Sequence, residues 1–262
     1  MNILDEFRLL KKESQKFSDG ERNLFDHLIN RRIATFYLFF IRNYTFSPNW
    51  ITSASVVWAL IASIALFYSQ SISQNLIVIL LLNISLTFDT LDGQYARYKN
   101  LGSEFGGWYD GVSDCFKYIF ILLAMGLTAF YHSNIEEELW IILLSKLGAS
   151  QTIVSLINDH PIISMILAFS ALGHIFMIYY IHTTRYKLSF NQGAAVQISS
   201  KKIVKKKYHL GIETLIYAVF TVLIPTGQKY GLLVFLNFFL PVLWIYPFYL
   251  TFKNSKRNVI HE

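Results

Sequence analysis

Residues 88–118 read FDTLDGQYARYKNLGSEFGGWYDGVSDCFKY and place four aspartates in an otherwise apolar part of the chain. Asp89 and Asp92 are three residues apart, and Asp110 and Asp114 are four apart, so each pair occupies one face of a helix. The loop between the two pairs, residues 98–105, is short. We therefore expect two antiparallel neighbouring helices whose aspartate faces converge.

The composition of the 262-residue chain is typical of a membrane protein. Hydrophobic residues make up 53% and charged residues 15% of it, whereas a soluble domain usually has about a quarter charged residues. The net charge of +6 suits anionic lipid or a phosphate-bearing substrate, and the long apolar stretches argue against nucleic acid as a partner. Cys115 is the single cysteine, so no intrachain disulfide and no cysteine-rich metal site can form.

Six stretches are apolar enough to cross a bilayer, which takes roughly 20 helical residues. They lie near 51–70, 75–97, 108–130, 161–183, 212–226 and 230–252. In the segment 1–46, charged residues alternate with Leu and Phe, as in an amphipathic helix at a membrane surface. The sequence thus predicts an all-α integral membrane protein with six transmembrane helices and an N-terminal amphipathic surface helix. Its parts are a cytoplasmic juxtamembrane segment 1–46, a six-helix domain 47–252 and a cytoplasmic tail 253–262.

The distribution of charge orients these spans. Six crossings put every basic cluster in the cytoplasm and the acidic run 136–138 outside, as the positive-inside rule expects. The basic clusters surround Lys11, Arg31, Arg185, residues 201–207 and residues 253–257. A seventh crossing at the apolar segment 139–157 would move half of them outside, so we interpret that segment as an external interfacial or re-entrant helix. Both termini are then cytoplasmic, and the low cysteine count and compact chain favour a bacterial plasma membrane.

The four aspartates are costly in this setting. A charged residue near the centre of a bilayer costs about 2.5–3.5 kcal/mol on insertion scales, so four cost about 10 kcal/mol. Small residues stand beside the acids and let helix backbones or a ligand approach closely; they are Gly93, Ala96, Gly106, Gly107 and Gly111. A cluster of this kind indicates a functional site.

Several carboxylates in one pocket need shared protons or cations to balance their charge. Oxygen ligands without Cys or His favour Mg²⁺ or Mn²⁺ over zinc, and two such ions can clamp a phosphoryl group. Arg97, one turn beyond the acids, is positioned to hold a pyrophosphate. Taken alone, this spacing also fits an ion or proton pathway, as in a cation-coupled membrane transporter.

The full pattern resembles the signature of the CDP-alcohol phosphotransferase family. It matches at every fixed position: Asp89-x-x-Asp92-Gly93-x-x-Ala96-Arg97, eight residues, then Gly106-x-x-x-Asp110-x-x-x-Asp114. The segment 47–52, SPNWIT, is similar to the family's Pro-Asn-x-x-Thr entry to its first span, and the six-helix plan agrees. The likeness covers roughly residues 46–252. The segment 19–32 loosely resembles the lead-in of members that use inositol phosphate.

This resemblance implies roles for individual residues. Asp89, Asp92 and Asp110 would bind two Mg²⁺ or Mn²⁺ ions, and Asp114 would be a further ligand and the general base. Gly93, Ala96 and Arg97 would shape the CDP site, which also includes Asp92, and Gly106 would leave room for the nucleotide. The acceptor hydroxyl attacks the phosphorus distal to cytidine and CMP leaves. Family members are commonly homodimers, which we expect here too.

Two further groups of residues have alternative interpretations. Asn49 and Thr52 either contribute to the CDP site or simply cap the first span. Arg185, Lys187, Lys206 and Lys207 either hold a phosphate on the acceptor or provide topological charge and contact anionic lipid.

The expected reaction belongs to phospholipid biosynthesis, with CDP-diacylglycerol or a related CDP-alcohol as the donor. We expect inositol phosphate or another polyol phosphate as the acceptor. The alternatives are glycerol 3-phosphate, serine, or an amino alcohol used with diacylglycerol.

Overall fold

A computed structural model describes the backbone of most of the helical part of the chain. The described residues are 7, 8, 10, 21–23, 30–132, 142, 146, 155, 156, 161–193, 207–209, 224 and 228–258. They divide into two compact units: residues 1–124 with 204–228, and residues 125–203 with 229–262. Each unit is considered by itself.

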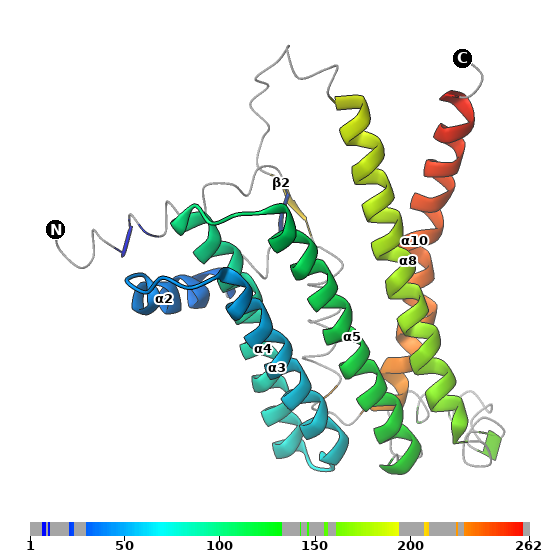
Figure 1. Cartoon of the computed structure of the whole chain (residues 1–262). Helices are drawn as coiled ribbons and strands as arrows, with labels where there is room; N and C mark the ends of the chain where they lie inside the picture. Colours follow the sequence, from blue (N-terminus) through cyan, green and yellow to red (C-terminus); the bar gives the residue numbers. More distant parts are fainter. Residues whose placement is uncertain are drawn as a thin grey trace. The chain divides into compact units, whose positions relative to one another are not determined.

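The first unit is built on a pair of long helices, α3 (Pro48–Tyr68) and α4 (Ile72–Lys99), which pack against each other (Figure 1). Pro48 stands in the first turn of α3, and the Ser47 side chain accepts a hydrogen bond from the Asn49 amide, which satisfies a donor at the helix start. Ser71 and Gln74 form a capping box at the start of α4. Three residues join the helices, and they are therefore antiparallel.

The turn after α4 brings the chain directly back into α5 (Glu104–His132). Asn100 ends α4 in the left-handed conformation, with φ 55°, which Asn tolerates better than most residues. The Leu101 amide closes the end by donating to the Ala96 carbonyl at 2.8 Å. The Ser103 side chain accepts from the Gly106 amide at 3.0 Å and so begins the next helix. The predicted short connection between the two aspartate-bearing helices is confirmed.

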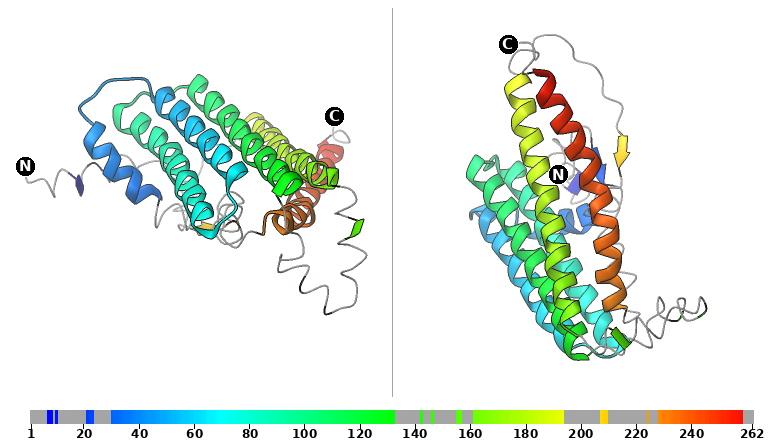
Figure 2. Two further views of the ribbon diagram at one scale, coloured as in Figure 1. Left: turned by 90° about the horizontal axis from the view of Figure 1, so that it is seen from below. Right: turned by 90° about the vertical axis from the view of Figure 1, so that its right-hand side faces the viewer.

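A short helix, α2 (Arg31–Ile41), packs on α4. Ala34, Thr35 and Leu38 on one side are buried, while large apolar residues on the other side are exposed; these are Ile33, Phe36, Tyr37 and Phe40. Figure 2 shows α2 as a separate helix before α3. Most of segment 1–29 lies outside the described residues, so the predicted N-terminal surface helix stays a prediction.

Tyr95 ties the connection between α2 and α3 to α4. Its hydroxyl donates to the Tyr44 carbonyl at 2.8 Å and accepts from the Phe46 amide at 3.2 Å. The Phe46 and Tyr95 rings stack with centroids 4.7 Å apart. Tyr95 is fully buried, in a core that includes Leu38 and Ile51. This contact sets where α3 begins, and therefore where Asn49 and Thr52 lie.

One feature of the first unit departs from the all-α prediction. Residues Glu21–Asn23 form β1, and they pair in parallel with Lys207–His209, which form β2. Glu21 is opposite Lys207 in this register. Hydropathy and helical periodicity carry no signal for a three-residue pairing between segments so far apart in the sequence.

The second unit contains α8 (Ile162–Gly193), α10 (Lys229–Asn258) and the end of α5. Helices α8 and α10 pack side by side (Figure 2), and the Asn237 side chain donates to the Leu167 carbonyl at 2.8 Å. The end of α5 approaches α8 closely. A Cβ added at Gly126 would lie 2.8 Å from the Cβ of Ala168, and the Ser164 hydroxyl donates to the Gly126 carbonyl at 3.0 Å.

Three described helices are long and apolar enough to cross a membrane: Pro48–Tyr68, Ile72–Lys99 and Glu104–Tyr131. They coincide with the first three predicted spans. Shorter apolar stretches, Ile162–Ile178 and Lys229–Val242, coincide with the fourth and sixth. The fifth predicted span, 212–226, lies outside the described residues except for Ile224, and segment 139–157 does so except for four single positions. The count of six spans therefore stays a prediction.

Candidate active site

The structure brings three of the four aspartates together. Asp89 and Asp92 stand on α4 and Asp110 stands on α5. One carboxylate oxygen from each lies within 4.8 Å of the others. Asp92 is buried, with 6% of its surface exposed. The predicted convergence of carboxylates from two adjacent helices is therefore confirmed for these three residues.

Helix α3 supplies a direct partner to this cluster. The Thr52 hydroxyl donates a hydrogen bond to the Asp92 carboxylate, and Thr52 is itself buried. Thr52 therefore does more than cap the first span, because its side chain orients a carboxylate of the cluster. A hydrogen bond to a charged group contributes about 1.5–3 kcal/mol.

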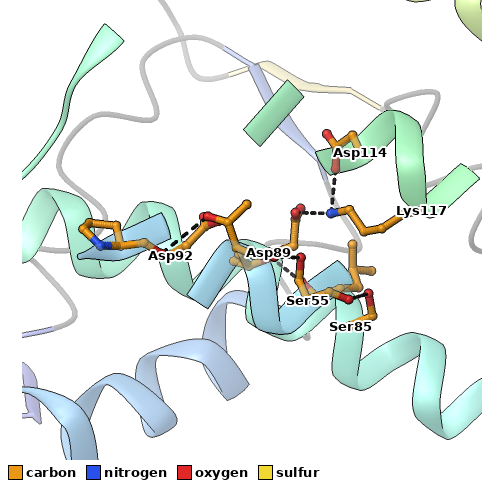
Figure 3. A network of polar contacts seen from close by, with 10 residues as sticks. Ser55, Ser85, Asp89, Asp92, Asp114 and Lys117 are labelled. Carbon is orange, nitrogen blue, oxygen red and sulfur yellow. Dashed lines mark hydrogen bonds and ion pairs between the residues drawn. The ribbon is translucent and has the colours of Figure 1, made fainter. Parts of the chain in front are cut away.

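Buried serines hold α3 and α4 in register beneath the cluster. The Ser85 hydroxyl on α4 donates to the Ser55 carbonyl on α3 at 2.8 Å, and the Ser55 hydroxyl donates to the Thr52 carbonyl at 2.8 Å (Figure 3). Ser55 and Ser85 are fully buried. These bonds fix the height of Thr52 relative to Asp89 and Asp92. Sequence reasoning did not single out either serine.

A cavity of ≈ 140 Å³ opens beside the acids. Its wall contains seven of the residues predicted for the metal and CDP sites: Asn49, Thr52, Asp92, Gly93, Ala96, Gly106 and Asp110. The remaining lining residues are Pro48 and Gly107 and the turn between the helices, Leu101, Gly102 and Ser103. A Cβ at Gly106 would lie 3.1 Å from the Ser103 Oγ and 3.6 Å from the Asn49 Oδ1. The absence of a side chain at Gly106 therefore keeps this part of the cavity open.

Two residues predicted for the site, Arg97 and Asp114, lie outside the cavity lining and the group of three acids. Arg97 is not among the described residues that line the cavity; its guanidinium lies along α4, 3.2 Å from the position of a Cβ on Gly93. Asp114 is not in the group of three converging acids. Its carboxylate pairs with the ammonium of Lys117 at 2.6 Å.

Lys117 is the charged residue of this site that sequence reasoning missed. It follows Asp114 by one helical turn, has 3% of its surface exposed, and pairs with both Asp89 and Asp114 (Figure 3). The sequence signal that could have identified it is a lysine within the apolar stretch that follows the four acids. A buried ammonium requires anionic partners, so this lysine could have been predicted to pair with the acids.

The structure does not describe the side chains of the four basic residues that were predicted to bind the acceptor. Arg185 and Lys187 belong to α8, where only the backbone is described, and the same holds for Lys207 in β2. Lys206 lies outside the described residues. Their role stays a prediction.

The donor set fits a divalent cation. Carboxylate oxygens are the preferred ligands of Mg²⁺ and related hard cations, and two ligands on opposite sides of one Mg²⁺ stand about 4.2 Å apart. The three oxygens lie within 4.8 Å of one another, so the group could hold a metal ion. The three acids are thus arranged to hold a cation at the edge of the cavity.

Three apolar helices are long enough to cross a membrane, and carboxylates from two of them form a group that could hold a metal ion. Residues 45–245 match the family model of CDP-alcohol phosphatidyltransferase, and the chain belongs to this family. Its members are phosphotransferases that transfer a phosphatidyl group from a CDP-alcohol to an alcohol acceptor with the help of divalent metal ions. A comparison of the sequence with curated proteins finds no significant match.

Proposed function

We propose that this chain transfers the phosphatidyl group of CDP-diacylglycerol, or of a closely related donor, to a phosphorylated polyol and releases CMP. Inositol phosphate is our first choice of acceptor. Glycerol 3-phosphate, serine and an amino alcohol used with diacylglycerol are the alternatives. The observation that carries the proposal is the meeting of Asp89, Asp92 and Asp110 within 4.8 Å beside the cavity that also contains Asn49 and Gly106.

The cavity residues suit a nucleotide diphosphate donor. Asn49 offers amide hydrogen-bonding groups at one end, and Gly93, Ala96 and Gly106 leave the wall without bulky side chains. Arg97 would reach the pyrophosphate by turning away from Gly93, and a guanidinium holds phosphate oxygens in a bidentate manner. Asp92 would contribute to both the donor site and the metal site.

In the proposed reaction, the acceptor hydroxyl attacks the phosphorus distal to cytidine, the bond from that phosphorus to the CMP oxygen breaks, and Asp114 takes the hydroxyl proton. Bound Mg²⁺ or Mn²⁺ would supply positive charge to the pyrophosphate oxygens during transfer. We propose two ions, the first held by Asp89, Asp92 and Asp110, and the second with Asp114 among its ligands.

The acceptor proposal is supported by charge and by the pairing of two distant segments. β1 lies within segment 19–32, whose sequence resembles members that use inositol phosphate, and it pairs with β2 next to the lysine-rich stretch 201–207. Lysine at this place would suit a phosphate on the acceptor. We propose that one or two of Arg185, Lys187, Lys206 and Lys207 bind this phosphate.

The test is release of CMP by the purified full-length chain in detergent. CDP-diacylglycerol and Mn²⁺ are supplied with each candidate acceptor in turn, and CMP is measured by chromatography. We expect release with at least one acceptor, and its loss when EDTA removes the metal. The Asp114→Asn variant should lose at least about 100-fold in kcat, because general bases contribute 10²–10⁴-fold.

The matched control is Glu104→Gln, which makes the same chemical change at an exposed position in the first turn of α5. This variant should release CMP at the rate of the unaltered chain. Full activity of Asp114→Asn would contradict the assignment of the base. Metal-dependent transport of an ion without CMP release would contradict the transferase proposal as a whole.

A further inference from the structure

Lys117 has an unusual position for a lysine in a membrane-spanning helix. Its side chain is 4% exposed, and its ammonium lies 2.6 Å from the Asp114 carboxylate and also pairs with Asp89. A buried ammonium persists only with close anionic partners. Here these partners come from two different helices, because Asp89 belongs to α4 and Asp114 to α5.

Both partners of Lys117 belong to the set of four acids. Asp89 is at the same time one of the three residues whose oxygens converge, and its Oδ1 atom accepts from Lys117. The ammonium therefore contacts one carboxylate oxygen of Asp89 and one of Asp114. Asp92 and Asp110, by contrast, line the cavity.

Because of the charge on Lys117, a first and a second divalent cation would not bind this site equally well. One divalent ion at Asp89, Asp92 and Asp110 leaves Asp114 balanced by Lys117, and the four carboxylates, the ammonium and the ion together then carry a net charge of only −1. A second divalent ion that uses Asp114 would stand within a few ångströms of an ammonium, in a surrounding where charges are weakly screened. Either the ammonium leaves Asp114 or the second ion binds weakly.

We propose that Lys117 is an internal counter-ion that the second divalent cation must displace from Asp114. The inference rests on the proposed function, because it assumes two cations at this site. The first cation binds tightly with Lys117 in place. A second cation would be held weakly beside Lys117 until the pyrophosphate of the donor adds negative charge, and once the ammonium has left it Asp114 would be able to accept the proton of the acceptor. Lys117 is thus a positioning residue that links release of Asp114 to the presence of substrate.

The experiment is a titration of the purified full-length chain with Mn²⁺, in which free Mn²⁺ is measured by electron paramagnetic resonance without any substrate. The unaltered chain should show one tight and one weak site. Lys117→Met removes the competing charge, so the weak site should tighten by about tenfold or more. Lys117→Arg keeps the charge and should retain the weak site.

Lys99→Met is the matched control, because Lys99 stands at the end of α4 and is outside the acid cluster. It should bind Mn²⁺ as the unaltered chain does. An equal or weaker second site in Lys117→Met would overturn the inference and leave Lys117 as a clamp between α4 and α5. Two Mn²⁺ sites of equal affinity in the unaltered chain would also overturn the inference. This outcome needs no variant, so it can be read even if Lys117→Met fails to fold.

Thermal unfolding provides a second measurement. Loss of the ammonium leaves two carboxylates uncompensated, so Lys117→Met should melt at a lower temperature without metal, and Mn²⁺ should raise its Tm more than that of the unaltered chain. Equal Mn²⁺-induced shifts would count against the counter-ion role.

If the unaltered chain binds no Mn²⁺ at all, the proposed metal site itself is wrong. If Mn²⁺ binds as expected but CMP is never released, the transferase proposal fails, and only the competition between Lys117 and the second cation stands.

Discussion

At the scale of single residues, the site depends on how each carboxylate is held. The Asp92 carboxylate accepts a hydrogen bond from the Thr52 hydroxyl, and the Asp89 and Asp114 carboxylates both form ion pairs with Lys117. Each of these contacts joins residues from different helices or from successive turns. The carboxylates are therefore oriented before any ligand arrives, which lowers the reorganisation needed when substrate binds.

Removal of the Thr52 hydroxyl should lower activity without unfolding the chain. In Thr52→Val the Asp92 carboxylate loses a buried donor, worth about 1.5–3 kcal/mol for a charged acceptor. We expect kcat/KM for the CDP donor to fall by about 10- to 100-fold, as measured by CMP release at several donor concentrations.

Thr52→Ser is the control for this change, because it keeps the hydroxyl and removes only a methyl group. It should retain most of the activity. If Thr52→Ser and Thr52→Val lose activity equally, the methyl group and its packing matter more than the hydrogen bond to Asp92.

At the scale of helices, α5 contributes to both units. Its first part carries Asp110, Asp114 and Lys117, and its end packs against α8 at Gly126. Small residues at such a crossing permit close van der Waals contact between membrane helices. The same helix therefore has one part that carries the acids and another that packs against α8, and substitutions can separate the two.

Gly126→Ala should destabilise the protein. The new Cβ would stand 2.8 Å from the Ala168 Cβ and 3.2 Å from the Met165 sulfur, which forces the helices apart. We expect a loss of about 1–3 kcal/mol, the usual range for overpacking. A lower apparent Tm in a fixed detergent is the measurement.

Gly173→Ala on α8 is the matched control, because a Cβ there meets no atom within 4 Å. Since Ala favours helix over Gly by about 1 kcal/mol, the Tm of this variant should be unchanged or higher. Equal destabilisation by both substitutions would mean that the contact between Gly126 and Ala168 is not the cause.

At the scale of the whole molecule, the arrangement of charge predicts the path through the membrane. Six crossings place the acidic run 136–138 outside and the basic stretch 201–207 inside, whereas seven crossings would place both outside. The two topologies thus differ in the side of the membrane on which residues 201–207 lie.

Single cysteines can distinguish these topologies. In a Cys115→Ser background, Glu137→Cys should react with a membrane-impermeant maleimide on intact cells. Lys202→Cys should react only after the membrane is permeabilised. Labelling of Lys202→Cys on intact cells would contradict the six-span arrangement and move the proposed acceptor-binding lysines away from the cytoplasmic side.

Localisation and assembly belong to this scale as well. We propose a bacterial plasma membrane protein with both termini in the cytoplasm, and a homodimer as in other members of the family. The Tyr, Trp and Phe residues exposed on α3 and α5, such as Trp50, Tyr68, Phe105 and Trp108, suit contact with lipid or with a second copy.

The sequence alone was sufficient for the features that depend on local spacing. Asp89 and Asp92 share a face because they are three residues apart, and the short connection predicted that α5 returns antiparallel to α4 with Asp110 near them. Apolar length predicted α3, α4 and α5 within a few residues, because bilayer thickness and helical rise set that length. The family also followed from the fixed spacing of these acids with Gly93, Ala96 and Gly106.

Tertiary structure decided the contacts between residues distant in sequence. Nothing local predicts that Thr52 reaches Asp92 across 40 positions or that Lys117 bridges Asp89 on α4 and Asp114 on α5. Such contacts depend on the relative height and rotation of packed helices, which buried groups such as Ser55, Ser85 and Tyr95 determine together. Spacing along one helix specifies which residues share a face, but the packing of several helices determines which partner each side chain meets.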